Sequence, residues 1–183
     1  MKPLRAVVIG SECTGKTTLA RALAARFSAP WVPEFCRAYQ DAKGALLDAS
    51  DVEPIARGQV AEADEAEARA AELVVLDTDL VSTAVYARHY YGTCPAWIDA
   101  ACLARRADLY LLCAPDLPWQ ADGQRDRPER REEMHRLFSE ALAALGARVE
   151  LVRGRGGARE ESAAESVTRV LAERRTRGRE GET

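Results

Sequence analysis

Apolar and polar residues follow two alternating patterns along this chain. Short, nearly continuous apolar runs alternate with longer stretches in which apolar residues recur at helical spacing. The runs that predict strands are 4–9, 30–35, 73–76, 109–113 and 147–152, and the stretches that predict helices are 16–27, 52–72, 79–91, 96–106, 128–145 and 158–175. Strands that alternate with helices form βαβ units, whose right-handed crossovers produce a parallel sheet. We therefore expect a three-layer α/β fold, a five-stranded parallel sheet covered by helices on both faces.

Length and charge narrow the class of protein. The 183 residues fit one domain, expected over 1–176, and residues 177–183 predict a disordered C-terminal tail. The formal net charge of −3 indicates no attraction to nucleic acid or to an anionic membrane. No apolar run approaches the roughly 20 residues of a membrane span, and the N-terminal run is too short for a signal peptide. The sequence favours a cytoplasmic protein with no nucleic-acid or membrane partner, and it leaves the oligomeric state open.

One stretch carries a complete phosphate-binding motif. Residues 10–17, G-S-E-C-T-G-K-T, match G-x-x-x-x-G-K-[ST] without a gap, between a predicted buried strand and a predicted helix. The glycines allow the backbone to curl so that successive N–H groups point toward an anion, and the helix adds its N-terminal donors. Lys16 is expected to bridge the β- and γ-phosphates of ATP, and Thr17 to bind Mg²⁺. The residues expected to contact the nucleotide are Gly10, Ser11, Glu12, Cys13, Thr14, Gly15, Lys16, Thr17 and Thr18.

The rest of the sequence indicates which kind of P-loop protein this is. The chain contains no asparagine, so it cannot contain the N-K-x-D motif with which GTP-binding switches read guanine. Recombination-type and transporter ATPases are usually larger and need further signature segments, which are missing. A small single-domain chain is commonly a nucleotide, nucleoside or metabolite kinase. Such a kinase needs a carboxylate near the acceptor hydroxyl, an acid for Mg²⁺ and a lid that carries arginine.

A first candidate carboxylate follows the second predicted strand. Ligands of an open α/β sheet bind beyond the carboxyl ends of its strands, so Glu34 is expected to project toward the phosphate site. There it could accept the proton of the acceptor hydroxyl or hold that hydroxyl in line. Arg37, one helical turn later, could pair with Glu34 or contact phosphate and substrate; the alternative is an ion pair at the surface. The neighbouring Trp31 and Phe35 are expected in the core rather than stacked on a base.

Two more carboxylates follow the third predicted strand. An acid directly after a buried strand is the Walker B arrangement, so Asp77 is expected to bind Mg²⁺ directly or through water. Asp79 begins the next helix and is either a substrate ligand or only the N-cap of that helix. Whether Glu34 or Asp77 takes the proton stays open. The tyrosines and the histidine of 86–91 are expected to form a packed aromatic face.

The stretch 116–131 is rich in proline, glycine and arginine, between a predicted strand and a predicted helix. This composition is too polar for a core and predicts a mobile lid over the nucleotide. Its arginines would neutralise the transferring phosphoryl group, with Arg125 as the catalytic candidate beside Arg127 and either Arg130 or Arg131. A solvated run of charges is the alternative.

Four stretches together resemble one family. In order and spacing, GSECTGKTTLARALA, VPEFCRAY, VVLDTDLVSTAVYARHYYG and ADLYLLCAPDLPWQADGQRD are similar to the NadR-type ribosylnicotinamide kinase domain, over nearly the whole chain. The resemblance implies a nucleotide-kinase-like P-loop fold that transfers the γ-phosphate of ATP to the ribose 5′-hydroxyl of nicotinamide riboside. It also implies that the W-x-x-D-G-x-R segment belongs to the lid, with Trp119 and Asp122 in contact with the substrate and Arg125 at the phosphoryl group.

The chain departs from this family pattern where the nicotinamide ring would bind. Family members stack the ring between an aromatic residue just before the glutamate of the second-strand motif and another in the helix before the D-T-D strand. Here the first position is Pro33, and the helix 52–72 contains no aromatic residue. Trp31, Phe35 and Trp119 could replace them. The hypotheses are a kinase of nicotinamide riboside or a related nucleoside, a nucleoside or nucleoside-monophosphate kinase, and a regulatory or binding module that hydrolyses ATP.

Overall fold

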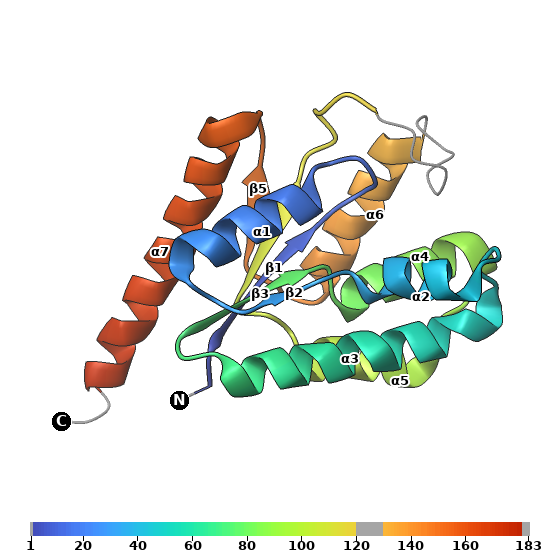
Figure 1. Ribbon diagram of the computed structural model, residues 1–183, viewed down its shortest axis with the longest axis horizontal. Coiled ribbons are helices and arrows are strands. Elements are labelled where there is room, and N and C mark those ends of the chain that lie inside the picture. The colour runs from blue at the N-terminus through green and yellow to red at the C-terminus, as the bar shows by residue number, and fades with distance from the viewer. Residues whose placement is uncertain (1, 120–129, 181–183) are drawn as a thin grey trace.

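The computed structural model of this chain describes residues 2–119 and 130–180. Within them, the strands are β1 (Leu4–Ile9), β2 (Trp31–Val32), β3 (Leu73–Asp77), β4 (Leu109–Cys113) and β5 (Val149–Val152). These strands form one sheet in the order β2-β3-β1-β4-β5, and every neighbouring pair is parallel (Figure 1). The five-stranded parallel sheet predicted from the apolar runs is confirmed.

Helices connect the strands and cover the sheet. They are α1 (Lys16–Phe27), α2 (Phe35–Lys43), the 3₁₀ turn η1 (Ala49–Asp51), α3 (Val52–Arg69), α4 (Leu80–Tyr91), α5 (Ala96–Ala104), α6 (Arg131–Ala144) and α7 (Gly156–Glu180). In the described part of the chain, none of these helices is both long enough and apolar enough to cross a membrane.

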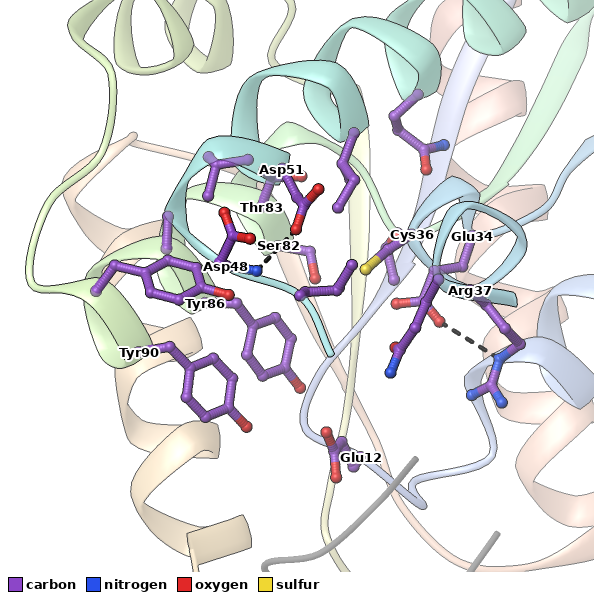
Figure 2. A pocket seen from close by; sticks show the side chains of 18 of the residues that line it. Glu12, Glu34, Cys36, Arg37, Asp48, Asp51, Ser82, Thr83, Tyr86 and Tyr90 are labelled. Carbon is purple, nitrogen blue, oxygen red and sulfur yellow. Dashed lines mark hydrogen bonds and ion pairs between the residues drawn. The ribbon is translucent and has the colours of Figure 1, made fainter. Parts of the chain in front are cut away.

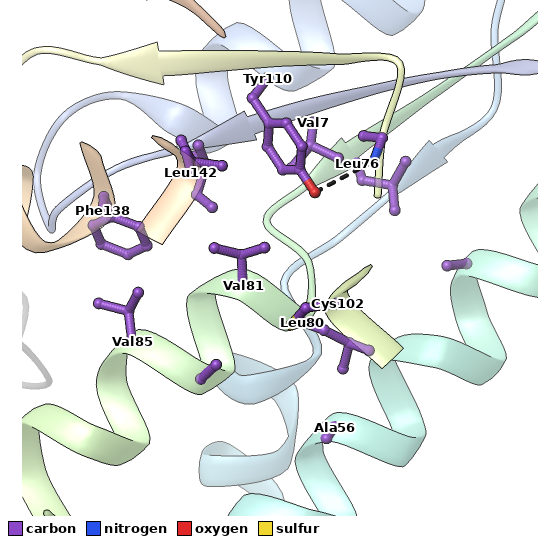
Figure 3. Close-up of a cluster of buried hydrophobic side chains, with 14 of the residues drawn as sticks. Val7, Ala56, Leu76, Leu80, Val81, Val85, Cys102, Tyr110, Phe138 and Leu142 are labelled. Atoms are coloured by element: carbon purple, nitrogen blue, oxygen red, sulfur yellow. Dashed lines mark hydrogen bonds between the residues drawn. The ribbon is translucent and has the colours of Figure 1, made fainter. Parts of the chain in front are cut away.

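Both faces of the sheet are buried because its central strands are apolar on both. Along β1, Leu4, Ala6 and Val8 belong to a core formed with α1 and α7. Val7 and Ile9 belong to a second core, formed with α3, α4, α5 and α6. Figure 3 shows this second core, in which apolar side chains of α4 and α6 meet beside the sheet. The alternation of β1 between two cores gives the three layers that the sequence predicts.

The structure corrects the prediction around β2. This strand contains two residues rather than the run 30–35, because Pro30 and Pro33 lack the N–H group that a sheet ladder needs. The sequence predicts no helix range where α2 lies, although it allows a helix start at Glu34 and Arg37. None of the residues of α2 is fully buried, so no row of core positions marks this helix.

The end of the chain also differs from the prediction. The sequence places the last helix at 158–175 and a disordered tail from 177, whereas α7 continues to Glu180. Residues 177–180 are therefore helical.

The carboxyl ends of the central strands meet at one edge of the sheet. In the parallel register Val8 pairs with Asp77, and Ile9 pairs with Leu112. The residues that follow β1, β3 and β4 are therefore neighbours in space although they are far apart in sequence. This edge is where ligands bind in open α/β sheets.

Candidate active site

The phosphate loop joins β1 to α1 with a backbone that few residues can adopt. Gly10 has a φ of +144°, and a Cβ atom there would lie 2.9 Å from the carbonyl oxygen of Cys113. Cys13 and Gly15 have φ values of 54° and 74°, in the left-handed region. Left-handed residues at every second position turn successive N–H groups to one side, which forms an anion-binding hollow at the positive end of α1.

The side chains of the loop reinforce this conformation. Thr14 Oγ1 donates a hydrogen bond of 2.7 Å to the carbonyl oxygen of Ser11. Lys16 Nζ donates to the same oxygen at 3.0 Å. The ammonium group therefore lies over the loop, within reach of an anion held there.

Asp77 lies at the end of β3 and contacts the first turn of α1. Thr17 Oγ1 donates a hydrogen bond of 2.5 Å to Asp77 Oδ2. Asp77 is 1% exposed, and its Oδ1 has no hydrogen-bond partner among the described residues. Burial, and then the charge of Glu34, raise the pKa of Asp77, while Lys16 and Thr17 oppose the shift. A hydroxyl beside a carboxylate with a free oxygen fits Mg²⁺, which prefers hard oxygen ligands.

Two adjoining cavities lie beside these residues. The first, of about 340 Å³, is lined by the loop and the start of α1, residues 13–18, together with Leu117 and Pro118. The second, of about 430 Å³, extends from Lys16 toward α2, η1 and α4. Lys16, Glu34 and Arg37 line both cavities. We call the first the phosphate cavity and the second the acceptor cavity, after the groups expected from the sequence beside the loop and beside Glu34.

Glu34 stands at the boundary because of the way α2 packs on α3. It occupies the N-cap position of α2, and its Oε2 lies 4.0 Å from Arg37 Nε. The ring of Phe35 lies against Gly58 of α3, where a Cβ atom would be 2.1 Å from the ring. Gln59 accepts a hydrogen bond of 2.9 Å from the backbone N–H of Phe35. Phe35 is therefore a packing residue, as expected, and it holds Glu34 in place.

The wall of the acceptor cavity opposite Glu34 is aromatic (Figure 2). Tyr86, Tyr90 and Tyr91 of α4 line it. The rings of Tyr86 and Tyr90 are stacked, with centroids 5.9 Å apart and planes 8° apart. Tyr86 also packs edge-on against Phe138 at 5.7 Å. The sequence predicted only a packed aromatic face here. The i, i+4 spacing of Tyr86 and Tyr90 is the signal that could have indicated a binding wall as well.

Carboxylates line the acceptor cavity near η1. Asp48 and Asp51 form a capping box, and Lys43 Nζ bonds to both of them. Hydrogen bonds from Ser50, and then from Lys43, lower the pKa of Asp48 to about 2. The bond from Lys43 is the largest cause that lowers the pKa of Asp51. Both groups are therefore anionic at neutral pH and give this end of the cavity a negative charge.

Asp79 lies away from both cavities. Its Oδ1 accepts a hydrogen bond from Val81 N–H at 3.0 Å and caps α4, while its Oδ2 accepts from the Tyr110 hydroxyl at 2.8 Å. Burial raises the pKa of Asp79, against these hydrogen bonds. The reason lies in Thr78, whose φ of 69° breaks the alternation of an extended strand and separates the two carboxylates. The structure therefore supports the N-cap alternative for Asp79 and brings only Asp77 to the site.

The remaining candidates have mixed outcomes. Trp31 lies in the core on the α1 side, with the Arg21 guanidinium 4.6 Å from its ring, and Trp119 lies 5.9 Å from Arg131. Neither residue belongs to the described lining of the two cavities. Asp122, Arg125 and Arg127 lie outside the described residues, so their predicted roles stay predictions.

Comparisons with known proteins define the class of this chain. A family model for the AAA domain matches residues 5–160, and the chain belongs to that family. The chain is 31% identical over 141 residues to the trifunctional NAD biosynthesis/regulator protein NadR of Escherichia coli (strain K12), over 74% of this chain and 34% of the relative. The NadR of Salmonella typhimurium is 32% identical over 122 residues, 64% of this chain and 30% of the relative. The chain thus spans about a third of the length of these curated relatives.

Solved structures agree with this assignment. NadR in complex with NR has a TM-score of 0.75 and 27% identity, over 93% of this chain and 50% of that one. NadR in complex with NAD and AMP-PNP has a TM-score of 0.74 and 27% identity, over 92% of this chain and 50% of that one. Thymidylate kinase from Ehrlichia chaffeensis shares the fold, with a TM-score of 0.67 and 14% identity over 93% of this chain and 100% of that one. The resemblance predicted from the four stretches is confirmed, and the chain has a nucleotide-binding, kinase-like P-loop fold.

Proposed function

We propose that this chain is an ATP-dependent kinase that phosphorylates the ribose 5′-hydroxyl of nicotinamide riboside or a closely related nucleoside. One observation carries the proposal: the phosphate cavity and the acceptor cavity meet at a wall formed by Lys16, Glu34 and Arg37. A phosphoryl group held by the loop would thus face a hydroxyl held in the neighbouring cavity. The similar NadR structures, in complex with NR and with NAD and AMP-PNP, support this pair of substrates.

The donor side of the mechanism belongs to the phosphate loop. The backbone N–H groups at the start of α1 would hold the β-phosphate, and Lys16 would bridge the β- and γ-phosphates. Thr17 and Asp77 would hold Mg²⁺, which supplies positive charge against the charge that develops on the phosphoryl oxygens. Arg37 lines both cavities and would add a second cation beside the transferring group.

The acceptor hydroxyl would be oriented by Glu34. This carboxylate lines both cavities, whereas Asp77 is buried and already accepts the Thr17 hydroxyl. Glu34 is therefore the better placed of the two to accept a hydrogen bond from the 5′-hydroxyl and to take its proton during transfer. Little further chemistry is required of the protein, because phosphoryl transfer depends mainly on alignment and on stabilisation of charge.

The base of the acceptor would lie between the tyrosines of α4 and the carboxylates near η1. A nicotinamide riboside carries a positive charge on its ring. Such a ring is attracted to the faces of Tyr86 and Tyr90 and to the anionic Asp48 and Asp51. These tyrosines would replace the aromatic residue that the family pattern has at the position of Pro33.

A panel of acceptors tests the proposal. ADP release is measured with ATP, Mg²⁺ and, in turn, nicotinamide riboside, uncharged ribonucleosides, thymidine and thymidine monophosphate, with Lys16→Ala as the inactive control. We expect release that depends on a riboside and is fastest with the cationic one. Release that is equal with and without every acceptor would contradict the proposal and favour a regulatory ATPase. Release only with the monophosphate would identify a nucleoside-monophosphate kinase.

A further inference from the structure

Two carbonyl groups of the phosphate loop are held from outside the loop. Thr14 and Lys16 occupy the carbonyl oxygen of Ser11 from within the loop. The next two bonded carbonyls, those of Cys13 and Thr14, accept hydrogen bonds from two arginines that lie more than a hundred residues away in sequence. These arginines are Arg131, the first residue of α6, and Arg159, in the first turn of α7.

Arg159 joins the loop to the ends of β4 and β5. It is 4% exposed. Its terminal nitrogens donate to the Thr14 carbonyl at 2.6 Å, to the Gly154 carbonyl at 3.0 Å and to Asp116 Oδ1 at 3.2 Å. The second oxygen of Asp116 accepts the Gly154 N–H at 2.7 Å. The position of the Thr14 peptide is therefore fixed by a charge-assisted network that joins three loops through the buried Arg159.

Arg131 makes the corresponding contact from the other side of the loop. Its guanidinium donates to the Cys13 carbonyl at 3.1 Å and to the Leu117 carbonyl at 2.9 Å, with the Trp119 ring centroid 5.9 Å away. Leu117 in turn lies over the loop, since a Cβ atom on Gly15 would be 2.9 Å from its side chain. Arg131 thus ties the loop to the segment that follows β4.

An anion-binding loop works only while its carbonyl groups point away from the anion. A peptide unit that rotates exchanges an N–H donor for a carbonyl oxygen, so attraction to phosphate becomes repulsion. The left-handed φ of Cys13 is unfavourable for a residue with a side chain, so the backbone by itself does not hold these peptide units against such a rotation. A guanidinium that holds each carbonyl from behind prevents it. Neither arginine is among the described residues that line the phosphate cavity.

We propose that Arg131 and Arg159 are positioning residues that set the affinity of the phosphate loop for nucleotide through the carbonyl groups of Cys13 and Thr14. The proposal rests on the proposed function only for the binding of a nucleotide at this loop, and not for the identity of the acceptor.

Binding and kinetics of five variants test this proposal. They are Arg159→Gln, Arg159→Lys, Arg131→Gln, Arg131→Lys and, as a matched control, Arg148→Gln, which removes a bidentate ion pair with Glu173 on the other side of the molecule. The Kd values of MgADP and of inorganic tripolyphosphate are measured by calorimetry on variants whose folding is checked by thermal melting. The KM values for ATP and for the acceptor are measured together with kcat.

We expect each glutamine variant to bind MgADP and tripolyphosphate about tenfold more weakly, by the same factor for both, because each variant loses a charge-assisted hydrogen bond to the loop. The KM for ATP should rise in parallel, while the KM for the acceptor and kcat change less than about threefold. The lysine variants should recover part of the affinity, and Arg148→Gln should change none of these values. If Arg159→Gln does not fold, Arg131→Gln decides the question, because Arg131 is only partly buried.

Three results would overturn the proposal. A folded Arg131→Gln protein with unchanged tripolyphosphate affinity would show that the carbonyl contact does not matter. A loss of affinity for MgADP with unchanged affinity for tripolyphosphate would indicate that the arginines act on the adenosine part of the nucleotide. A fall in kcat larger than the rise in the KM for ATP would place a guanidinium on the transferring phosphoryl group. A chain that binds MgADP as expected but phosphorylates no riboside would contradict the proposed function and leave this proposal intact.

Discussion

The two cavities that meet at Lys16 and Glu34 are built in different ways. The wall of the phosphate cavity comes mainly from six consecutive residues, 13–18, and its shape follows from backbone conformation. The wall of the acceptor cavity comes from side chains of the phosphate loop, α2, η1, α3 and α4, which are spread over residues 12–91. The first is thus encoded locally, while the second exists only after helices have packed against one another.

The two cavities also differ in charge. Around the phosphate cavity lie Lys16, Arg37 and the positive end of α1, which suit an anion. At the far end of the acceptor cavity lie Asp48 and Asp51, both held anionic by hydrogen bonds. This difference favours a triphosphate in one cavity and disfavours it in the other. Substitutions should therefore affect the two substrates separately.

Lys16→Ala should have the largest effect, and it should act at the donor side. Loss of the ammonium group removes a cation that would follow the phosphoryl charge through transfer, so kcat/KM should fall about a thousandfold or more. Steady-state ADP release checks this. Lys43→Ala, which removes the cation beside Asp48 and Asp51, is the control and should keep the MgADP affinity of the parent. An active Lys16→Ala protein would contradict the assignment of ATP to the phosphate cavity.

Asp77→Asn should lower phosphoryl transfer about 100-fold or more, since it removes a carboxylate that would hold Mg²⁺. The same change should raise the melting temperature of the nucleotide-free protein. The pKa of Asp77 is raised in the folded chain, so its ionised form costs stability, and this cost grows as pH rises from the ordinary aspartate pKa of 3.8 through the raised folded pKa. Thermal melting across pH checks the sign: the advantage of the variant should shrink toward acid pH. An advantage that persists there would refute this account.

Gly58→Ala should weaken acceptor binding although Gly58 is not among the residues that line the acceptor cavity. The added Cβ would lie 2.1 Å from the Phe35 ring, so α2 must move, and Glu34 with it. We expect a loss of about 1–3 kcal/mol in the free energy of unfolding and a rise of about tenfold in the acceptor KM, with unchanged MgADP affinity. Denaturant unfolding and steady-state kinetics measure both. Gly157→Ala, where nothing lies within 4 Å of the added atom, is the control. An unchanged acceptor KM would separate Glu34 from acceptor binding.

Tyr90→Leu should have the smallest effect. It removes a half-exposed ring from the aromatic wall, so the acceptor KM should rise about five- to tenfold while the KM for ATP stays the same. Tyr90→Phe keeps the ring and should keep the parent value. If Tyr90→Leu binds the acceptor as well as the parent does, the base lies elsewhere in the cavity.

Much of the fold could be predicted because its signals are local. The central strands are continuous apolar runs, and α1, α3 and α4 have clear helical spacing, so the parallel sheet and its layers follow. β2 and α2 carried weaker signals. β2 is two residues long between prolines, and α2 buries none of its residues, so neither leaves a clear apolar pattern. The disordered tail predicted from 177 overlapped a helix that continues to Glu180.

The candidate site likewise contains parts with a local sequence signal and parts without one. By itself, the sequence determined the phosphate loop and the acid after β3, because a glycine-rich turn and a strand end fix their own backbone. Only the tertiary structure decided between the two roles left open for Asp79, because its carboxylate caps α4 and accepts the Tyr110 hydroxyl of β4 instead of reaching the site. It also decided that tyrosines line the acceptor cavity and that distant arginines hold the loop. Such contacts join segments far apart in the chain, and packing, not local preference, determines which side chains meet.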